Sequence, residues 1–239
     1  MKIWQKIEKV SAELLPDTAH IYLVNLDQIK VDLNILTTDE QARAHKMHFA
    51  MHQQRTAKAR AILRLLLSQY THTLPGDLKF STYEYGKIYL ADHTVQFNLA
   101  HSHDYAVFSF TRDIEIGVDI EQPRTIEFDA IAKRIMSDTE YVYWSSLTPR
   151  NDEQIKLFFQ IWTRKEALVK ATGDGLSGPL KSLSTIDSDG NICSAVNYSD
   201  KKQLWLSDLP SLTKIINRPF YAALAATSFL TTNCYHLTL

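Results

Sequence analysis

Hydrophobic positions along the chain switch between a spacing of two residues and a helical spacing. The alternation over Ala19–Asp27 predicts a strand, and a long helical pattern then runs from Thr37 to about Tyr70. Thr37 and Glu40 form the sequence signature of a capping box, which marks the beginning of this helix. Because the helical pattern is so long, we expect a bend or break near its middle.

The next part of the chain predicts a group of strands and then a group of helices. The strands are expected at Leu78–Tyr83, Ile88–Leu90, Val95–Ala100, Ala106–Thr111 and Ile114–Glu121. Gly86 is expected in a turn. The helices are expected at Ile126–Lys133, Asp138–Leu147 and Asp152–Ala171. The stretch TGDGLSGP that follows holds three of the seven glycines and predicts a loop.

Strands therefore flank helices in two successive rounds, since the last sixty residues alternate again and end in a strand-like stretch. No repeat is visible residue by residue, but the order of elements is similar in both rounds. The pattern predicts an α+β protein of two halves, residues 1–115 and residues 116–239.

Composition and charge narrow the functional classes. Hydrophobic residues make up 45% of the chain, and 26 basic against 27 acidic side chains leave a net charge of −1, so no global field attracts nucleic acid. The two cysteines are too few and too far apart for a disulfide framework or a zinc motif. No apolar run approaches the roughly 20 residues that cross a bilayer. Because the N-terminal stretch also lacks the apolar core of a signal peptide, we expect a cytoplasmic protein without membrane or nucleic-acid partners.

The strand stretch GVDIE places two carboxylates side by side. With a period of two, Val118 and Ile120 share one face, whereas Gly117, Asp119 and Glu121 share the other. Two neighbouring carboxylates repel each other unless water, a cation or a proton lies between them. A solvated strand face explains this pattern as well as a metal site does. Gly117 on the acidic face allows a close approach to the backbone.

The helix predicted at Asp152–Ala171 holds an acid where apolar residues are expected. Glu166 falls in the middle of a hydrophobic stripe that is formed by Ile155, Phe158, Phe159, Trp162 and Val169. Lys170 lies four residues later and Lys165 lies on the opposite flank. An ion pair within the helix would need only one lysine. Two lysines and an acid beside a glycine-rich loop favour a phosphate and a metal.

A third polar stretch surrounds Lys87, in a predicted turn, and the His101-Ser102-His103 end of a strand. His101 and His103 have a spacing that could hold zinc, but no third nitrogen or sulfur ligand is evident. A helically spaced group formed by His45, His48 and His52 is interrupted by apolar residues and is typical of a helix surface. Walker, Rossmann and HExxH motifs are absent from the sequence.

Three stretches taken together, QFNLAHS at 96–102, GVDIE at 117–121 and FFQIWTRKEALVKATGDGL at 158–176, resemble the signature motifs of the 4′-phosphopantetheinyl transferases. The similarity is to the larger, two-lobed type and runs from about Arg55 to Leu180. Ala100 stands where the family usually has serine, so one hydroxyl contact to phosphate is missing. The resemblance implies a pseudo-twofold α+β fold with the active site in the cleft between the halves.

The resemblance also implies the reaction and its partners. The 4′-phosphopantetheine arm of coenzyme A would move to a serine of an apo acyl, peptidyl or aryl carrier protein, releasing adenosine 3′,5′-bisphosphate. Asp119, Glu121 and Glu166 would hold magnesium or manganese, the cations that favour an all-oxygen ligand set. Glu166 would also be the base for the carrier serine, and Lys170 would act at the pyrophosphate. A monomer is implied as well.

The coenzyme would be held by further cations that match family positions. Lys165 would hold phosphate together with Lys170, whereas Arg55, Lys87 and His101 would hold the 3′-phosphate and adenine end. Each of these last three also has a plainer interpretation. Arg55 would be a charge on a helix surface, Lys87 a solvated turn residue and His101 a histidine of the core. For the carrier, whose recognition helix is acidic, the sequence offers a candidate docking segment at Lys133, Arg134, Ile135 and Met136.

Two other functions remain open at this stage. The chain could be a carrier- or coenzyme-binding protein that lacks activity, although the presence of all three acids and both lysines argues against it. It could also be an unrelated magnesium-dependent phosphotransferase for a small molecule. The pathway of the carrier, whether fatty acid, polyketide, nonribosomal peptide or lysine, is not predicted by the sequence.

Overall fold

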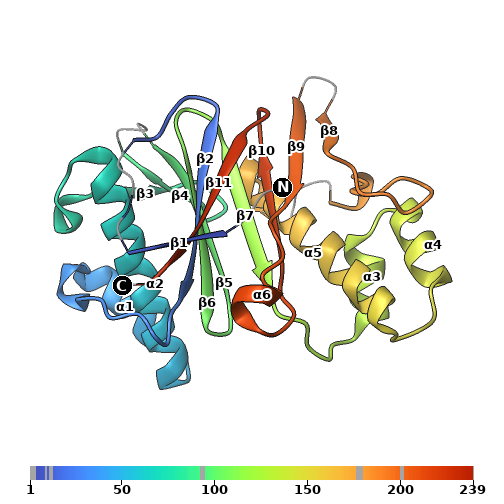
Figure 1. The fold of residues 1–239 in the computed structure, drawn as a ribbon, viewed down its shortest axis with the longest axis horizontal. Coiled ribbons are helices and arrows are strands. Elements are labelled where there is room, and N and C mark those ends of the chain that lie inside the picture. The colour runs from blue at the N-terminus through green and yellow to red at the C-terminus, as the bar shows by residue number, and fades with distance from the viewer. Residues whose placement is uncertain are drawn as a thin grey trace.

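Two stacked β-sheets with helices on their outer faces make up the protein (Figure 1). The structure is a computed structural model, and it describes residues 4–8, 10, 13–91, 95–175, 180–199 and 202–238. The five strands of the first sheet are, in spatial order, β1 (Trp4–Ile7), β11 (Thr231–Leu237), β2 (Thr18–Asn25), β6 (Tyr105–Thr111) and β5 (Gln96–Ser102). The four strands of the second sheet are β7 (Ile116–Glu121), β10 (Tyr221–Ala226), β9 (Lys202–Asp208) and β8 (Ala195–Ser199).

A hairpin and six α-helices complete the described fold. The hairpin consists of β3 (Phe80–Thr82) and β4 (Ile88–Leu90). The helices are α1 (Thr38–His45), α2 (Ala50–Thr71), α3 (Phe128–Ile135), α4 (Asp138–Ser146), α5 (Asp152–Thr172) and α6 (Thr213–Ile216). The mixed α+β class predicted from the sequence is confirmed. Each strand and helix predicted between residues 19 and 171 is present; the strand Ile88–Leu90 has the predicted ends, and most of the others are shifted by a few residues.

The long helical pattern after Thr37 breaks into two helices, as its length predicts. Thr37 caps α1 through the predicted capping box, in which its hydroxyl accepts from the Glu40 backbone and the Glu40 carboxylate accepts from the Thr37 backbone. The break falls after Lys46, and α2 begins at Ala50. The loop predicted after α5 begins at Gly173, which ends the helix with a φ of 78°, whereas residues 176–179 of that loop lie outside the described residues.

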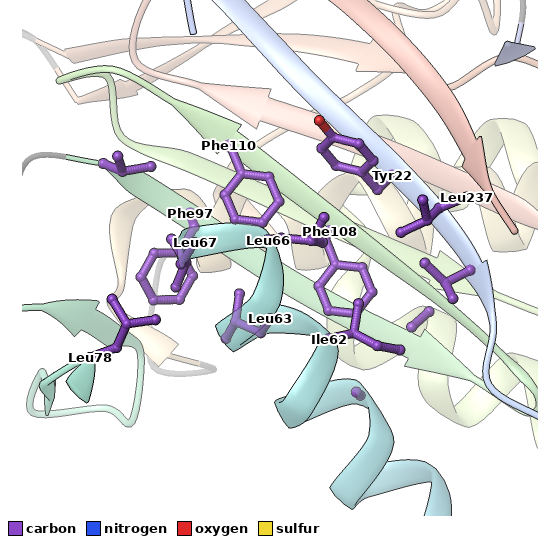
Figure 2. Packing of buried hydrophobic residues seen from close by; sticks show 14 of the residues in the cluster. Tyr22, Ile62, Leu63, Leu66, Leu67, Leu78, Phe97, Phe108, Phe110 and Leu237 are labelled. Atoms are coloured by element: carbon purple, nitrogen blue, oxygen red, sulfur yellow. The ribbon is translucent and has the colours of Figure 1, made fainter. Parts of the chain in front are cut away.

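Each sheet has one face against a helix and one face against the other sheet. On the first sheet, Phe97, Phe108 and Phe110 face α2, and Figure 2 shows Ile62, Leu63, Leu66 and Leu67 of that helix packed against them. The opposite face meets the second sheet through Ile21, Leu23 and Val107, against Val118 and Ile120 of β7. Apolar residues on both faces of β2 and β6 explain why these strands are buried along their whole length.

Helix α5 lies on the other face of the second sheet at very short range. Gly117 of β7 has no side chain there, and a Cβ at this position would stand 2.1 Å from the Ala167 carbonyl oxygen and 2.3 Å from the Ala171 nitrogen. Ala225, the partner of Gly117 on β10, is also small and buried against α5. The close approach that Gly117 predicts is therefore an approach of the helix backbone itself, and it sets the position of every side chain on this part of α5.

The last strand of the chain lies inside the first sheet. β11 pairs in parallel with β1 on one side and with β2 on the other, whereas the remaining neighbours in both sheets are antiparallel. The chain thus leaves the first sheet after β6 and returns to it at Thr231. The division into halves 1–115 and 116–239, and their pseudo-twofold relation, stay predictions. Every helix of the described residues is too short or too polar to cross a bilayer.

The Gly117 contact gives a first test. Replacing Gly117 by alanine forces a methyl group into the α5 backbone, so we expect the free energy of unfolding to fall by about 1–3 kcal/mol or more. Urea denaturation followed by circular dichroism measures this. The matched control is Gly76→Ala, since a Cβ at Gly76 meets nothing within 4 Å. Equal stability of the two variants would contradict the tight packing of α5 on β7.

Candidate active site

Helix α5 is buried on almost every side, which the sequence does not predict. Asn151 caps its beginning by accepting from the Gln154 backbone. Phe158 and Phe159 face a cluster with α3 and α4, whereas Leu168 and Ala171 face the second sheet. The apolar surface of α5 is therefore wider than the single hydrophobic stripe predicted around Glu166, because α5 lies between a sheet and a second layer of helices (Figure 1). Any charged residue on it needs a partner.

Lys165 finds that partner away from the predicted phosphate site. Its ammonium lies 2.6 Å from the Glu140 carboxylate and donates to the carbonyl oxygens of Leu180 and Leu183. The exposed fractions of the Lys165 and Glu140 side chains are 1% and 0%. All three N–H donors of this lysine are in use, so the structure does not bring Lys165 to a ligand site. It joins α5 to α4 and to the segment after the glycine-rich loop.

Lys170 and Asp119 form the central ion pair of the candidate site. The Lys170 ammonium donates to Asp119 Oδ1 over 2.6 Å. The other oxygen, Asp119 Oδ2, is buried and has no hydrogen-bond partner among the described residues. Burial raises the pKa of Asp119 to about 7, although Lys170 opposes this shift. A buried carboxylate oxygen without a donor is costly, and it indicates a place for a cation or a proton.

The other two acids lie within electrostatic reach of Asp119. Glu121 and Glu166 both raise the pKa of Asp119, and Glu121 also raises that of Glu166, which burial has already raised. Glu121 accepts hydrogen bonds from the Ser102 hydroxyl and from the Arg124 guanidinium, and both donor–acceptor distances are 3.0 Å. Asp119, Glu121 and Glu166 thus repel one another across a small space. Among the described residues no three His, Cys, Asp or Glu side chains are close enough to form a complete metal site.

A cavity of about 410 Å³ adjoins these acids. Its walls come from α1, α2, the β3–β4 hairpin, β5, the end of α5 and the glycine-rich loop. Lys170 and His101 both line it and connect it to the acids. The cavity therefore lies between helix α2 of the N-terminal region and the end of α5.

Lys87 projects from the hairpin turn into the junction between the two sheets. Its ammonium donates to the carbonyl oxygens of Ile116, at the start of β7, and Ala171, near the end of α5. Burial lowers the pKa of Lys87 to about 8. Lys87 lines the cavity, as the sequence-based site requires, but it also bridges the hairpin to α5.

The β5 residues divide between two faces. Asn98 and Ser102 face the second sheet, where the Asn98 side chain accepts from the Val118 backbone and Ser102 bonds Glu121. Ala100 lies between them in the apolar cluster that joins the sheets, so a serine is replaced here by a core residue. His101 points the other way and lines the cavity, and desolvation, followed by the Lys170 charge, lowers its pKa.

Arg55 lies beside the cavity rather than in its wall. Its guanidinium bonds both carboxylate oxygens of Asp27, over 2.8 and 2.5 Å, and it is not among the described residues that line the cavity. Its charge still contributes to the lowered pKa of His101. The structure therefore places Arg55 behind the cavity, as a fixed charge.

Two arginines that the sequence analysis missed do line the cavity. Arg43 is exposed on α1, and Arg60 on α2 lies 3.0 Å from Glu40. One nitrogen of Arg60, Nη1, is buried and has no hydrogen-bond partner among the described residues. The signal that could have found Arg60 is its spacing: Thr56 and Arg60 are four residues apart on one helix and reach the same cavity.

The predicted carrier-docking segment is only half exposed. Ile135 and Met136 are buried against α5, whereas Lys133 and Arg134 are exposed. Lys133 pairs with Asp129 in the preceding turn. Arg134 is close enough to Glu166 to lower the pKa of that carboxylate against the effect of burial. This segment thus offers charge, but not the apolar surface predicted for it.

Comparison with known proteins identifies the family. The model of the 4′-phosphopantetheinyl transferase superfamily matches residues 115–218. The chain is 37% identical over 173 residues to the 4′-phosphopantetheinyl transferase HetI of Nostoc sp., covering 69% of this chain and 72% of HetI. The chain belongs to the 4′-phosphopantetheinyl transferase superfamily. This transferase is also 32% identical over 162 residues to Sfp of Bacillus subtilis, covering 67% of this chain and 70% of Sfp.

A more distant relative of this transferase is the mouse L-aminoadipate-semialdehyde dehydrogenase-phosphopantetheinyl transferase, 27% identical over 159 residues, with 61% of this chain and 50% of the relative covered. The resemblance to the larger, two-lobed type predicted from three short motifs is confirmed by relatives of the Sfp and HetI type. The protein is a 4′-phosphopantetheinyl transferase that acts on carrier proteins. The match includes Asp119, Glu166 and Lys170.

The two roles of lysine on α5 can be separated by experiment. Replacing Lys165 by methionine leaves Glu140 buried without its cation, so we expect a loss of about 3–5 kcal/mol in the free energy of unfolding. The KM for coenzyme A of the folded variant should not change. Lys133→Met removes a fully exposed pair and is the control for stability. A raised KM with unchanged stability in Lys165→Met would instead indicate the phosphate contact.

Proposed function

We propose that this transferase moves the 4′-phosphopantetheine arm of coenzyme A to a serine of an apo carrier protein in a magnesium-dependent reaction. The serine oxygen forms a bond to the phosphorus of the pantetheine phosphate. The bond from that phosphorus to the bridging oxygen breaks, and adenosine 3′,5′-bisphosphate leaves. The observation that supports this most directly is the pairing of an acid cluster and Lys170 with a cavity rich in cations.

The acids fit a hard divalent cation. Asp119 Oδ2 is buried and lacks a donor, and the donor set of Asp119, Glu121 and Glu166 consists of oxygen alone. Magnesium commonly binds one or two carboxylates and completes its shell with water and substrate phosphates. A set of three convergent protein ligands is therefore not needed before the coenzyme binds. When bound, the cation would neutralise charge on the pyrophosphate.

Glu166 is suited to take the proton of the carrier serine. Burial raises its pKa above the ordinary value, which makes its carboxylate a stronger base than an exposed glutamate. Lys170 limits that rise and holds Asp119 in place. A Lys170 ammonium at the edge of the cavity is also placed to stabilise the charge that the leaving bisphosphate gains.

The cavity offers the cations that a coenzyme with three phosphates requires. Lys87, Arg43 and Arg60 line it, His101 adds a ring that can form hydrogen bonds, and Arg55 adds charge from behind. The buried Nη1 of Arg60, without a partner among the described residues, is a donor in reserve for an anion. We therefore add Arg43 and Arg60 to the residues that the sequence predicts for coenzyme binding. They take the place of Lys165 in that set.

The acid cluster is tested by removing charge without changing shape. We expect Asp119→Asn and Glu166→Gln each to lower kcat by about 10²–10⁴-fold, because the cation site and the base are lost. The assay loads an apo carrier and follows the mass gain of one phosphopantetheine, with and without magnesium. Glu153→Gln, an exposed acid on the same helix, is the control. Full activity in Asp119→Asn would exclude the metal assignment. Turnover of coenzyme A without a carrier would favour a small-molecule phosphotransferase.

The coenzyme site is tested at Lys87. Removing its charge with Lys87→Gln should raise the KM for coenzyme A by about 10-fold or more, as expected for one charge-assisted hydrogen bond. Because the pKa of Lys87 is lowered to about 8, the wild-type ammonium loses its proton above that pH. The difference in KM between wild type and variant should therefore shrink as pH rises through about 8. Lys79→Gln, exposed before the same hairpin, should change nothing.

A further inference from the structure

The junction between α1 and α2 exposes three large apolar side chains within five residues. Met47, Phe49 and Met51 are 44%, 69% and 50% exposed. Lys46, His48 and His52, also exposed, alternate with them. We call these six residues the junction patch. Soluble proteins rarely expose several large apolar side chains together unless that surface meets a partner.

Hydrogen bonds fix the shape of the junction patch. The Gln53 side-chain amide donates to the carbonyl oxygens of His45 and Met47, the latter over 2.7 Å. The Met47 backbone nitrogen donates to Ala44. The Phe49 ring lies against the His52 ring with centroids 5.9 Å apart. An ordered turn that holds apolar side chains outward loses little conformational entropy when a partner binds.

The chain segment that contains the junction patch carries formal charge of one sign. From Gln41 to Gly76 the chain contains no aspartate or glutamate, although 27 acids occur elsewhere. The same segment contains six lysines and arginines. Arg55, Arg60 and Arg64 are neutralised by acids outside the segment, but Lys46 of the patch is exposed, and so is Arg43 three residues before it. An apolar surface with cationic edges complements a partner that presents apolar side chains among acids.

The junction patch lies one helical turn before the part of α2 that lines the active-site cavity. One turn after His52 on α2, Thr56 lines the cavity, followed by Ala59 and Arg60. His52 is close enough to His101, which lines the cavity, to help lower its pKa. In Figure 1 the α1–α2 junction and helix α5 lie on opposite sides of the paired sheets, so a partner seated on the patch approaches the acids from the α2 side.

The alternative docking segment on α3 lacks apolar surface. Ile135 and Met136 are buried, so Lys133 and Arg134 can contribute charge alone. Phe229 is equally exposed, at 64%, but it belongs to the connection between β10 and β11 and packs on Trp205, away from the residues that line the cavity. The junction patch thus combines exposed apolar area with positive charge, one helical turn from Thr56 in the cavity wall.

We propose that the junction patch is a docking surface for the carrier protein and receives an acidic, amphipathic helical face of that partner. Phe49 is its apolar anchor, with Met47 and Met51 beside it, and Lys46 pairs with acids of the carrier. This inference rests on the proposed function, since it names where the second substrate of that reaction binds.

The test introduces acid into the junction patch. We expect Phe49→Asp and Met51→Asp each to raise the KM for the apo carrier by about 10- to 30-fold, the size of an interface hot spot. The KM for coenzyme A and kcat at saturating carrier should stay unchanged. Phe229→Asp, equally exposed and remote from the cavity, is the matched control. Lys46→Glu should also raise the carrier KM and reduce the dependence of kcat/KM on salt.

Direct binding separates this proposal from the proposed function. Titration calorimetry with a carrier whose target serine is replaced by alanine measures docking without chemistry, and the patch variants should bind at least about 10-fold more weakly than wild type. Wild-type transfer and binding with an unchanged carrier KM in both patch variants would overturn the docking surface alone. Absence of wild-type transfer and binding across a panel of carriers would overturn both. Loss of self-association in the variants, seen by sedimentation, with the carrier KM unchanged, would overturn docking and assign the patch to a second copy of this chain.

Discussion

The backbone contact between α5 and β7 at Gly117 determines the geometry of the whole active site. The strand supplies Asp119 and Glu121, and the helix supplies Glu166 and Lys170, so the distance between the two elements sets the distance between the acids and their cation. Small residues on both sides allow this short distance, and the Lys170–Asp119 ion pair joins the same two elements. The chemistry therefore depends on the absence of a side chain, which is a constraint of packing.

Two lysines five positions apart on α5 differ in their hydrogen-bond partners, and this difference separates a structural lysine from a candidate functional one. Lys165 has a carboxylate and two carbonyl oxygens around it, and this fully satisfied arrangement stabilises the junction with α4. Lys170 satisfies one oxygen of Asp119 and leaves the other without a donor among the described residues. Incomplete pairing inside a protein is costly, and it is retained where a substrate or ion completes it.

The sequence predicted the local features of the site better than the distant ones. Gly117, the acids of β7 and the capping box at Thr37 are recognisable because their physical causes lie within a few residues. The pairing of Lys165 with Glu140 joins two separate helices. The helical period of α5 alone therefore could not show which way the Lys165 side chain points. Arg60 and the burial of Met136 likewise depend on which layer covers each helix. The metal and base roles of Asp119, Glu121 and Glu166 stay predictions.

The position of β11 in the first sheet has a consequence for how the protein reaches its native state. This strand lies between β1 and β2, so β1 has no neighbour in the described sheet and β2 can pair only with β6 until residues 231–237 have been made. During translation β2, β6 and β5 can pair in chain order, but β2 keeps one edge unpaired and the first sheet stays incomplete until β11 joins it. The cavity is also completed late, because helix α2, which forms one of its walls, packs against that sheet. Catalytic competence would then emerge in one late, cooperative step rather than lobe by lobe.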